Sequence, residues 1–304
     1  MPTASRQDFQ QGQTVLIRSA EEIARTLDAD GRLEGLPFMP EMARFCGTRA
    51  RIHRHADKTC VEGYGLRYMD STVILEDLRC DGSSHDGCQR TCMLFWKEAW
   101  LRLLEDDAPA EASSPGAALS LLDLPTMRGD RYVCQSTELH QATRPMSRWN
   151  VTHFLREIRR GELTLPGFMQ ILYTTSRGRL RALLGLPLVP GMAGEQKRNP
   201  RGNLGLQPGD WVEVLSHEEI QATLDPNGKN SGLSFEPGMV DCLGKRYQVE
   251  HQLDRIILEQ TGKMATLAHT VTLKGVTCQG PCSKNCPRNN ALFWRESWLR
   301  RVDA

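Results

Sequence analysis

The chain has 304 residues, with 38 Lys and Arg against 37 Asp and Glu, and 39% of its residues are hydrophobic. This balance excludes intrinsic disorder over the whole chain. A net charge of +1 excludes a global field that would steer the protein toward nucleic acid or anionic lipid. No stretch approaches the ~18–20 apolar residues of a membrane span, and the polar residues 1–13 lack the apolar core of a secretion signal. We therefore expect a cytoplasmic protein without membrane contact.

The most informative feature of the sequence is an internal duplication. Residues 12–47 match residues 209–244 at a constant offset of 197, and a second stretch matches at an offset of 198. In that stretch LFWKEAWLR (94–102) aligns with LFWRESWLR (292–300). Two copies of about ninety residues indicate two small domains rather than a solenoid. The division expected is a first repeat, a linker with a helical middle region, and a second repeat, at 12–104, 105–208 and 209–304.

Each repeat is predicted to be rich in β-strands. In the first repeat strands are expected at 15–18, 49–55 and 72–75, with counterparts at 211–215, 247–252 and 270–273. Ser19 and Ser216 stand before EEI as N-caps of a short helix. The broad apolar surface of residues 94–104, which includes Trp96 and Trp100, predicts a C-terminal helix that packs on the sheet with at least one tryptophan buried.

The middle region is predicted to be helical. Asn150 can cap a helix in VTHFLREIRR, and Gly161 ends it. A second helix is expected after Pro166. The predicted fold is therefore of the α+β class: two homologous small β-barrel-like modules, each closed by a C-terminal helix, flanking a helical middle region.

Two family resemblances bear on the repeats. The opening GDWVEV strand, the long first loop and the short strands resemble the Src-homology-3-like barrels of many bacterial accessory proteins. The repeated GLPFMPEM and FWKEAWL blocks are similar to those of an uncharacterised bacterial family. This likeness covers both repeats, about 180 residues, and it implies a duplicated barrel module. It carries no catalytic motif and therefore no activity.

The strongest chemical signal is the segment CDGSSHDGCQRTC, which places Cys80, His85, Cys88 and Cys92 within 13 residues. Thiolates and an imidazole at this spacing are typical of a tetrahedral zinc site. Cys60 upstream is a fifth candidate. We favour Cys60, Cys80, Cys88 and Cys92 as ligands, with His85 replacing one of them or lying beside them. The competing interpretation is that these cysteines are separate small hydrophobic residues in a core.

The second copy of this segment is altered. Cys278 and Cys286 correspond to Cys80 and Cys88, Cys282 adds a third thiol, and Ile257 lies opposite Cys60. A tetrahedral site there needs a fourth ligand, for which His269, His251 and Cys242 are the candidates. The second repeat is either a degenerate zinc site or free of metal.

An iron–sulfur cluster is the alternative cofactor. The letters CDGS resemble the CDGSH iron–sulfur family, whose two-iron cluster uses three cysteines and one histidine. In this chain the motif reads CDGSSH, so His85 is displaced by one position, and the upstream Cys-x-Cys pair of that family is missing. The resemblance is therefore judged coincidental.

The function predicted is a zinc-binding, non-enzymatic scaffold or interaction protein whose partner is an unidentified protein. The alternative is a metal-dependent enzyme or iron–sulfur redox protein that uses the first Cys/His cluster. Nucleic acid is a further possible partner, because arginines gather in the middle region near Trp149 and Tyr173. Cys134 carries no recognisable nucleophile motif and is expected to be simply packed.

Overall fold

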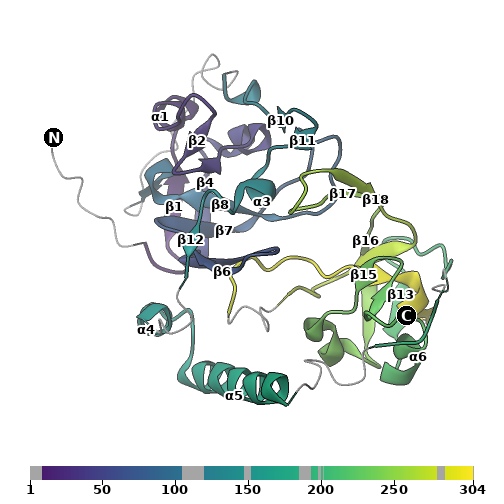
Figure 1. Ribbon diagram of the computed structural model, residues 1–304. Helices are drawn as coiled ribbons and strands as arrows, with labels where there is room; N and C mark the ends of the chain where they lie inside the picture. The colour runs from purple at the N-terminus through teal and green to yellow at the C-terminus, as the bar shows by residue number, and fades with distance from the viewer. Residues whose placement is uncertain are drawn as a thin grey trace. The chain divides into compact units, whose positions relative to one another are not determined.

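The computed structural model describes residues 9–104, 120–146, 152–184, 193–197, 200, 202–278 and 285–303 (Figure 1). These residues form two compact units. Unit 1 comprises the described parts of Met1–Leu165 together with Ile257–Met264 and Cys286–Arg288, and unit 2 comprises the rest. Unit 1 therefore contains the first repeat, part of the middle region and two short segments of the second repeat. No described helix is long and apolar enough to cross a membrane.

The first repeat is built around one five-stranded antiparallel sheet in the order β8-β7-β4-β1-β9. Its elements are β1 (Thr14–Ile17), α1 (Ala20–Ala24), β2 (Arg32–Leu33), β3 (Leu36–Pro37), the 3₁₀ helix η1 (Pro40–Phe45), β4 (Arg49–His55), β5 (Lys58–Val61), β6 (Gly65–Tyr68), β7 (Thr72–Arg79), β8 (Met93–Lys97), the 3₁₀ helix η2 (Glu98–Trp100) and β9 (Leu101–Leu103). Ser19 caps α1 through a reciprocal capping box with Glu22, as its sequence predicts.

The sheet of the first repeat is strongly curved. Strands β8 and β9 lie at its opposite edges, although only the three residues of η2 separate them in the chain. Five strands about 4.8 Å apart place the edges of a flat sheet about 19 Å apart, whereas the chain from Lys97 to Leu101 spans at most about 15 Å. The sheet must therefore curl into a half-barrel.

The prediction that a C-terminal helix closes each module is wrong. Residues 93–103 form strand β8, a single 3₁₀ turn and strand β9 instead. Phe95 and Trp96 pair with Ile74 and Val73 of β7, so this segment is buried on both faces of a sheet. A short segment that is apolar on all sides has the same pattern in a buried strand and in a buried helix. The predicted burial is confirmed, because Trp96, Trp100, Trp294 and Trp298 are all 0% exposed.

The second repeat repeats this topology in unit 2. Its sheet has the order β20-β19-β16-β13-β21, in which every strand is the counterpart of the strand at the same position of the first sheet. Its elements are β13 (Trp211–Val214), α6 (His217–Gln221), β14 (Lys229–Asn230), β15 (Leu233–Ser234), η3 (Pro237–Cys242), β16 (Arg246–Gln252), β17 (Arg255–Ile257), β18 (Met264–Thr266), β19 (Thr270–Leu273), β20 (Trp294–Arg295), η4 (Glu296–Trp298) and β21 (Leu299–Arg301). The tandem repeat is confirmed at the level of the two sheets.

The middle region separates the two sheet modules and is largely helical. It contains β10 (Met127–Arg128), β11 (Arg131–Tyr132), α3 (Gln135–Glu138), β12 (Arg144–Pro145), α4 (Thr152–Arg159) and α5 (Leu165–Leu183). The two predicted helices correspond to α4 and α5, and the proposed cap Asn150 lies outside the described residues. Strand β12 joins β6 and β5 in a three-stranded sheet of unit 1.

A buried carboxylate holds the chain after α4 against the first sheet. Glu162 Oε1 accepts a hydrogen bond from the backbone N–H of His55 at 2.8 Å and lies 2.7 Å from His55 Nδ1. The Glu162 side chain is only 1% exposed. Burial on its own raises the pKa of Glu162, but the hydrogen bonds from His55 outweigh it and lower the pKa below the ordinary value of 4.5.

This lowered pKa predicts a loss of stability in acid. A carboxylate with a lowered pKa stabilises the folded state fully above its unfolded pKa, and this contribution disappears as the pH falls through the folded pKa. We expect Glu162→Gln to lower the free energy of unfolding by about 1.5–3 kcal/mol at neutral pH. As the pH falls below the ordinary carboxyl pKa, the free energy of unfolding of this variant should decrease less steeply than that of the wild type. Urea unfolding across this pH range measures both effects. The exposed Glu250 provides the control Glu250→Gln, and equal acid profiles of the three proteins would contradict the assignment.

Candidate metal centre

The cysteine-rich segment forms a closed loop between β7 and β8. The backbone N–H of Cys80 donates to the carbonyl of Cys92 at 2.9 Å, which closes the loop at its base. Inside the loop Gly82 has a φ of +70°, and a Cβ at this position would lie 2.1 Å from the carbonyl oxygen of Cys88. Only glycine fits there. The glycine of the CDG segment is therefore required by the loop's own packing.

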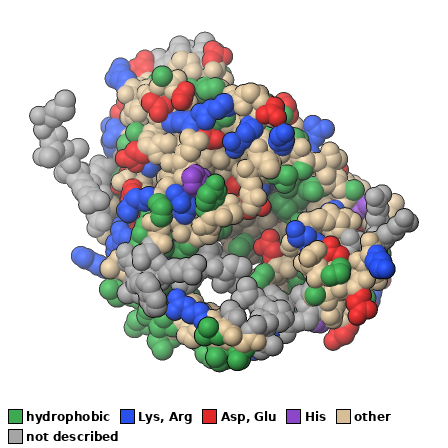
Figure 2. Space-filling view, viewed as in Figure 1, with side chains coloured by type: hydrophobic (Ala, Val, Ile, Leu, Met, Phe, Trp, Pro, Cys, Tyr) green, Lys and Arg blue, Asp and Glu red, His purple; other side chains and the backbone are tan. Residues whose placement is uncertain are grey.

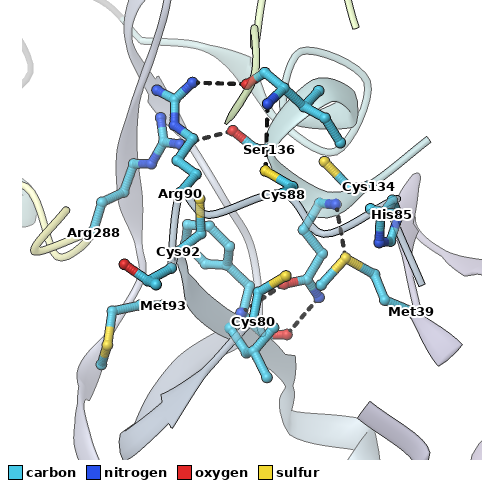
Figure 3. Close-up of a pocket in the computed structure, with 15 residues that line it drawn as sticks. Met39, Cys80, His85, Cys88, Arg90, Cys92, Met93, Cys134, Ser136 and Arg288 are labelled. Atoms are coloured by element: carbon cyan, nitrogen blue, oxygen red, sulfur yellow. Dashed lines mark hydrogen bonds between the residues drawn. The ribbon is translucent and has the colours of Figure 1, made fainter. Parts of the chain in front are cut away.

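Four thiols line one pocket of unit 1 (Figure 3). They are Cys80, Cys88, Cys92 and Cys134. Figure 3 shows Arg288 and Arg90 on one side of the pocket and His85 on the other. Of the five candidate ligands of the first repeat, three contribute their sulfurs to this pocket, namely Cys80, Cys88 and Cys92. The pocket also contains the thiol of Cys134, which its sequence context predicts to be simply packed.

Cys134 reaches the pocket because α3 packs on the edge of the first sheet. The side-chain amide of the next residue, Gln135, accepts from the Phe95 backbone N–H at 2.9 Å and donates to the Phe95 carbonyl at 2.8 Å. This amide pairs with β8 as a neighbouring strand does. Cys134 is consequently held beside the loop that carries Cys92, although 42 positions separate them in the chain.

Burial makes most of these thiols poor acids. It is the main cause that raises the pKa values of Cys80 and Cys88, and it raises the pKa of Cys134 to about 12. The charge of Glu41 raises the pKa of Cys80 further, whereas the backbone N–H of Ile257, 3.3 Å from Cys88 Sγ, opposes the shift at Cys88. Without a cation, burial therefore favours the neutral thiol form of Cys80, Cys88 and Cys134.

His85 is placed with both of its ring nitrogens hydrogen-bonded to protein oxygens. Nδ1 lies 3.1 Å from Glu41 Oε1 and Nε2 lies 2.9 Å from the Val133 carbonyl, and the residue is 1% exposed. Burial lowers the pKa of His85, but the hydrogen bond and charge of Glu41 outweigh it and raise the pKa above its usual value. Both nitrogens donate to acceptors, so neither is directed at a ligand in this structure. Cys80 Sγ also donates to Glu41 Oε1, at 3.1 Å.

Cys60 lies outside this pocket and beside Cys286. Its backbone N–H donates to Cys286 Sγ at 3.4 Å, and its thiol hydrogen-bonds to the same sulfur. The hydrogen bond from the Cys60 thiol is the main cause that lowers the pKa of Cys286, and the backbone N–H and charge of Arg288 act in the same direction. The pKa of Cys60, the donor, is raised. The two thiols form a donor–acceptor pair.

Among the described residues, no group of three or more His, Cys, Asp and Glu side chains is arranged to hold a metal ion. The nine described cysteines are free thiols. Cys278 is half-buried, and its backbone N–H donates to the Asn290 carbonyl at 2.7 Å in unit 2. Cys282 lies outside the described residues. Metal binding at the sequence-predicted positions remains a prediction.

A buried ion pair borders the pocket, and sequence reasoning missed it. Arg288 and Glu259, both from the second repeat, lie 2.7 Å apart with side chains 6% and 3% exposed. Arg288 also donates to Ser136 Oγ at 3.1 Å, and Glu259 accepts from the Glu62 backbone N–H at 2.8 Å. The duplication contained a signal for this arginine, because Arg90 occupies the equivalent position of the first repeat.

Comparison with known proteins returned no family model, no curated protein and no solved structure that matches this chain.

Proposed function

We propose that the protein is a zinc-binding, non-enzymatic scaffold or interaction protein, and that each duplicated module is a small barrel. The observation that supports zinc binding is the convergence of four thiols on one pocket. They come from two parts of the chain, the loop 80–92 and the start of α3. An ion bound to both parts stabilises unit 1 by linking them.

The chemistry of the pocket suits a cation with affinity for sulfur. Buried thiols with raised pKa values lose their protons when a divalent ion supplies the compensating charge. Zinc accepts four thiolates in a tetrahedral arrangement with Zn–S distances of about 2.3 Å. Because the described side chains are not arranged as such a group, binding requires the four cysteine side chains that line the pocket to reorient around the ion by rotation about χ1. His85 then acts as a buried donor that holds Glu41, outside the ligand set.

A structural role is favoured over a catalytic one. A catalytic zinc keeps an open coordination position and needs an acid or base nearby. The two aspartates in the loop already have partners, because Asp81 is bonded to Arg44 and Asp86 accepts from the Tyr132 hydroxyl. Four thiolate ligands close the coordination sphere. The enzyme or iron–sulfur alternative uses the same cysteines and is separated by the experiment below.

The partner proposed is a protein. Helix α5 exposes a series of large apolar side chains, which Figure 2 shows along that helix, and exposed apolar patches are typical of protein contacts. These side chains are Leu165, Met169, Leu172, Tyr173, Leu180 and Leu183. For nucleic acid the support is weaker. Two of the arginines on which it depends, Arg156 and Arg160, are paired with Asp57, and on the face in Figure 2 basic and acidic side chains are interspersed.

The zinc proposal predicts metal in the purified protein. We expect colourless protein with at least about one equivalent of zinc, and a melting temperature that falls on chelation, because losing the ion removes several kcal/mol of coordination free energy. Cys88→Ser is expected to lower both zinc content and melting temperature. Elemental analysis and thermal unfolding measure these quantities.

The control is Cys46→Ser, since Cys46 is a half-buried cysteine outside the pocket. It is expected to retain zinc. Metal-free protein whose melting temperature is indifferent to chelators would refute the proposal. Visible charge-transfer bands from iron would establish the iron–sulfur alternative instead.

A further inference from the structure

A second cavity of unit 1 has no part in the proposed zinc function. It is a cleft of about 570 Å³, which is the size of a site for a small organic molecule. Its lining side chains come from the end of β4, the turns that precede β5 and β7, η2 and the region of α4, and all of them belong to unit 1. Among the described residues, this cleft and the thiol pocket share no lining side chain. Binding in the cleft can therefore be tested separately from zinc binding.

A buried histidine in this cleft is particular to the first repeat. His55, at the end of β4, pairs with Val73, and Gln252 pairs with the equivalent Val271 of the second sheet. Gln252 is exposed, whereas His55 is only 5% exposed. The same strand order thus forms with an exposed glutamine at this position. The sheet itself does not require the histidine.

The His55 ring has one nitrogen available to a ligand. Its Nδ1 lies 2.7 Å from Glu162 Oε1, and the Glu162 side chain is 1% exposed. Its Nε2 makes no hydrogen bond within the described part of the chain, and the residue lines the cleft. In the neutral ring Nδ1 donates to the carboxylate, so Nε2 is an acceptor with a buried negative charge behind it. This part of the cleft is therefore suited to a cationic N–H donor.

Positive charge enters the cleft from α4 and the residue that follows it. Arg160 Nη1 lies 2.9 Å from Asp57 Oδ2, and Arg156 Nη1 lies 3.7 Å from the same oxygen. Two guanidinium groups thus share one carboxylate, which leaves a surplus of positive charge. At 3.7 Å the Arg156 group is beyond hydrogen-bond distance of Asp57. Arg156 can therefore form the two parallel hydrogen bonds with which a guanidinium binds a carboxylate.

Two further carboxylates line the cleft, those of Asp70 and Glu98. Asp70 is compensated by Arg144, which donates to its two oxygens at 2.8 and 2.9 Å. Glu98 and the carboxylate behind His55 repel a purely anionic ligand, and the surplus charge of the two arginines repels a purely cationic one. A ligand that carries both signs matches the cleft.

We propose that this cleft binds a small amino acid in its zwitterionic form. The carboxylate of the ligand pairs with Arg156, and its ammonium group donates to His55 Nε2. Glu162 is a positioning residue, because it orients the imidazole through Nδ1 and supplies the negative charge that favours an ammonium group over a neutral donor. The charge-assisted hydrogen bonds at the two ends of the ligand provide both affinity and selectivity.

The test is isothermal titration calorimetry of the full-length protein with glycine, β-alanine and 4-aminobutyrate, which hold the two charged groups at increasing distances. We expect at least one of them to bind. Arg156→Met should weaken this binding by at least about tenfold, because it removes a charge-assisted pair. The matched control is Arg159→Met, since Arg159 is an exposed residue of the same helix outside the cleft, and its affinity should equal that of the wild type.

A second comparison changes the ligand. For β-alanine, propionate lacks the ammonium group and ethylamine lacks the carboxylate, and each is expected to bind at least about tenfold more weakly. His55→Gln, which introduces the residue of the second repeat, should also weaken binding of the amino acid, and circular dichroism verifies that the sheets are retained. The proposal is wrong if none of the three amino acids binds, if Arg156→Met and Arg159→Met have equal effects, or if either analogue binds as tightly as the amino acid. None of these outcomes depends on zinc content, so the zinc proposal stands or falls separately.

Discussion

Trp100→Ala is expected to destabilise the first module by about 3–5 kcal/mol, which is much of the stability of a small domain. Trp100 is 0% exposed, its ring meets Phe38 edge-on at 5.3 Å, and its indole N–H donates to Thr26 Oγ1 at 3.0 Å. Alanine leaves a large cavity and removes the hydrogen bond that Thr26 Oγ1 accepts, although this hydroxyl still donates to the Ile23 carbonyl at 2.7 Å. Urea unfolding followed by circular dichroism measures the change.

The second repeat offers a matched variant. Trp298 meets Phe235 at 5.5 Å and donates to Thr223 Oγ1 at 3.0 Å, so Trp298→Ala is expected to destabilise its own module to the same extent. Trp211 is 37% exposed, and Trp211→Ala serves as the control with a smaller loss. A Trp100→Ala protein with wild-type stability and reduced affinity for a partner would show instead that this segment is a recognition surface.

Arg288→Met is expected to cost about 3–5 kcal/mol, because it leaves the buried carboxylate of Glu259 without its main counter-charge. The remaining cation, Arg90, lies 3.8 Å from that carboxylate, whereas Arg288 lies 2.7 Å from it. The variant also removes the guanidinium hydrogen bond to the Cys60 carbonyl. The free energy of unfolding in urea is the quantity to compare.

A double variant separates the charge effect from the packing effect. Arg288→Met/Glu259→Gln is expected to be more stable than Arg288→Met alone, since no uncompensated charge remains. The control is Arg301→Met, whose pair with Asp210 at 3.1 Å has side chains 52% and 29% exposed, and its loss should stay below about 1 kcal/mol. If Arg288→Met and Arg301→Met have equal effects, the buried pair contributes nothing specific.

Local structure followed from local sequence wherever short-range physics decides it. The capped helix after Ser19, strand β4 at Arg49–His55 and the helices of the middle region were all predicted from residues within a few positions of one another. The helix predicted at 94–104 failed for the same reason. An apolar segment has no polar face to reveal its period, so whether it pairs as a strand depends on β7, which lies elsewhere in the chain.

The amino-acid sequence by itself determined that the chain is a duplication and that thiols cluster in residues 80–92, because both are patterns along the chain. Only the tertiary structure decided which thiols meet. Cys134 joins the first loop through the packing of α3, and Cys60 meets Cys286 across 226 positions. Which thiols meet depends on where distant strands lie and on which backbone N–H groups donate hydrogen bonds to each loop sulfur. Neither produces a periodic pattern in the sequence.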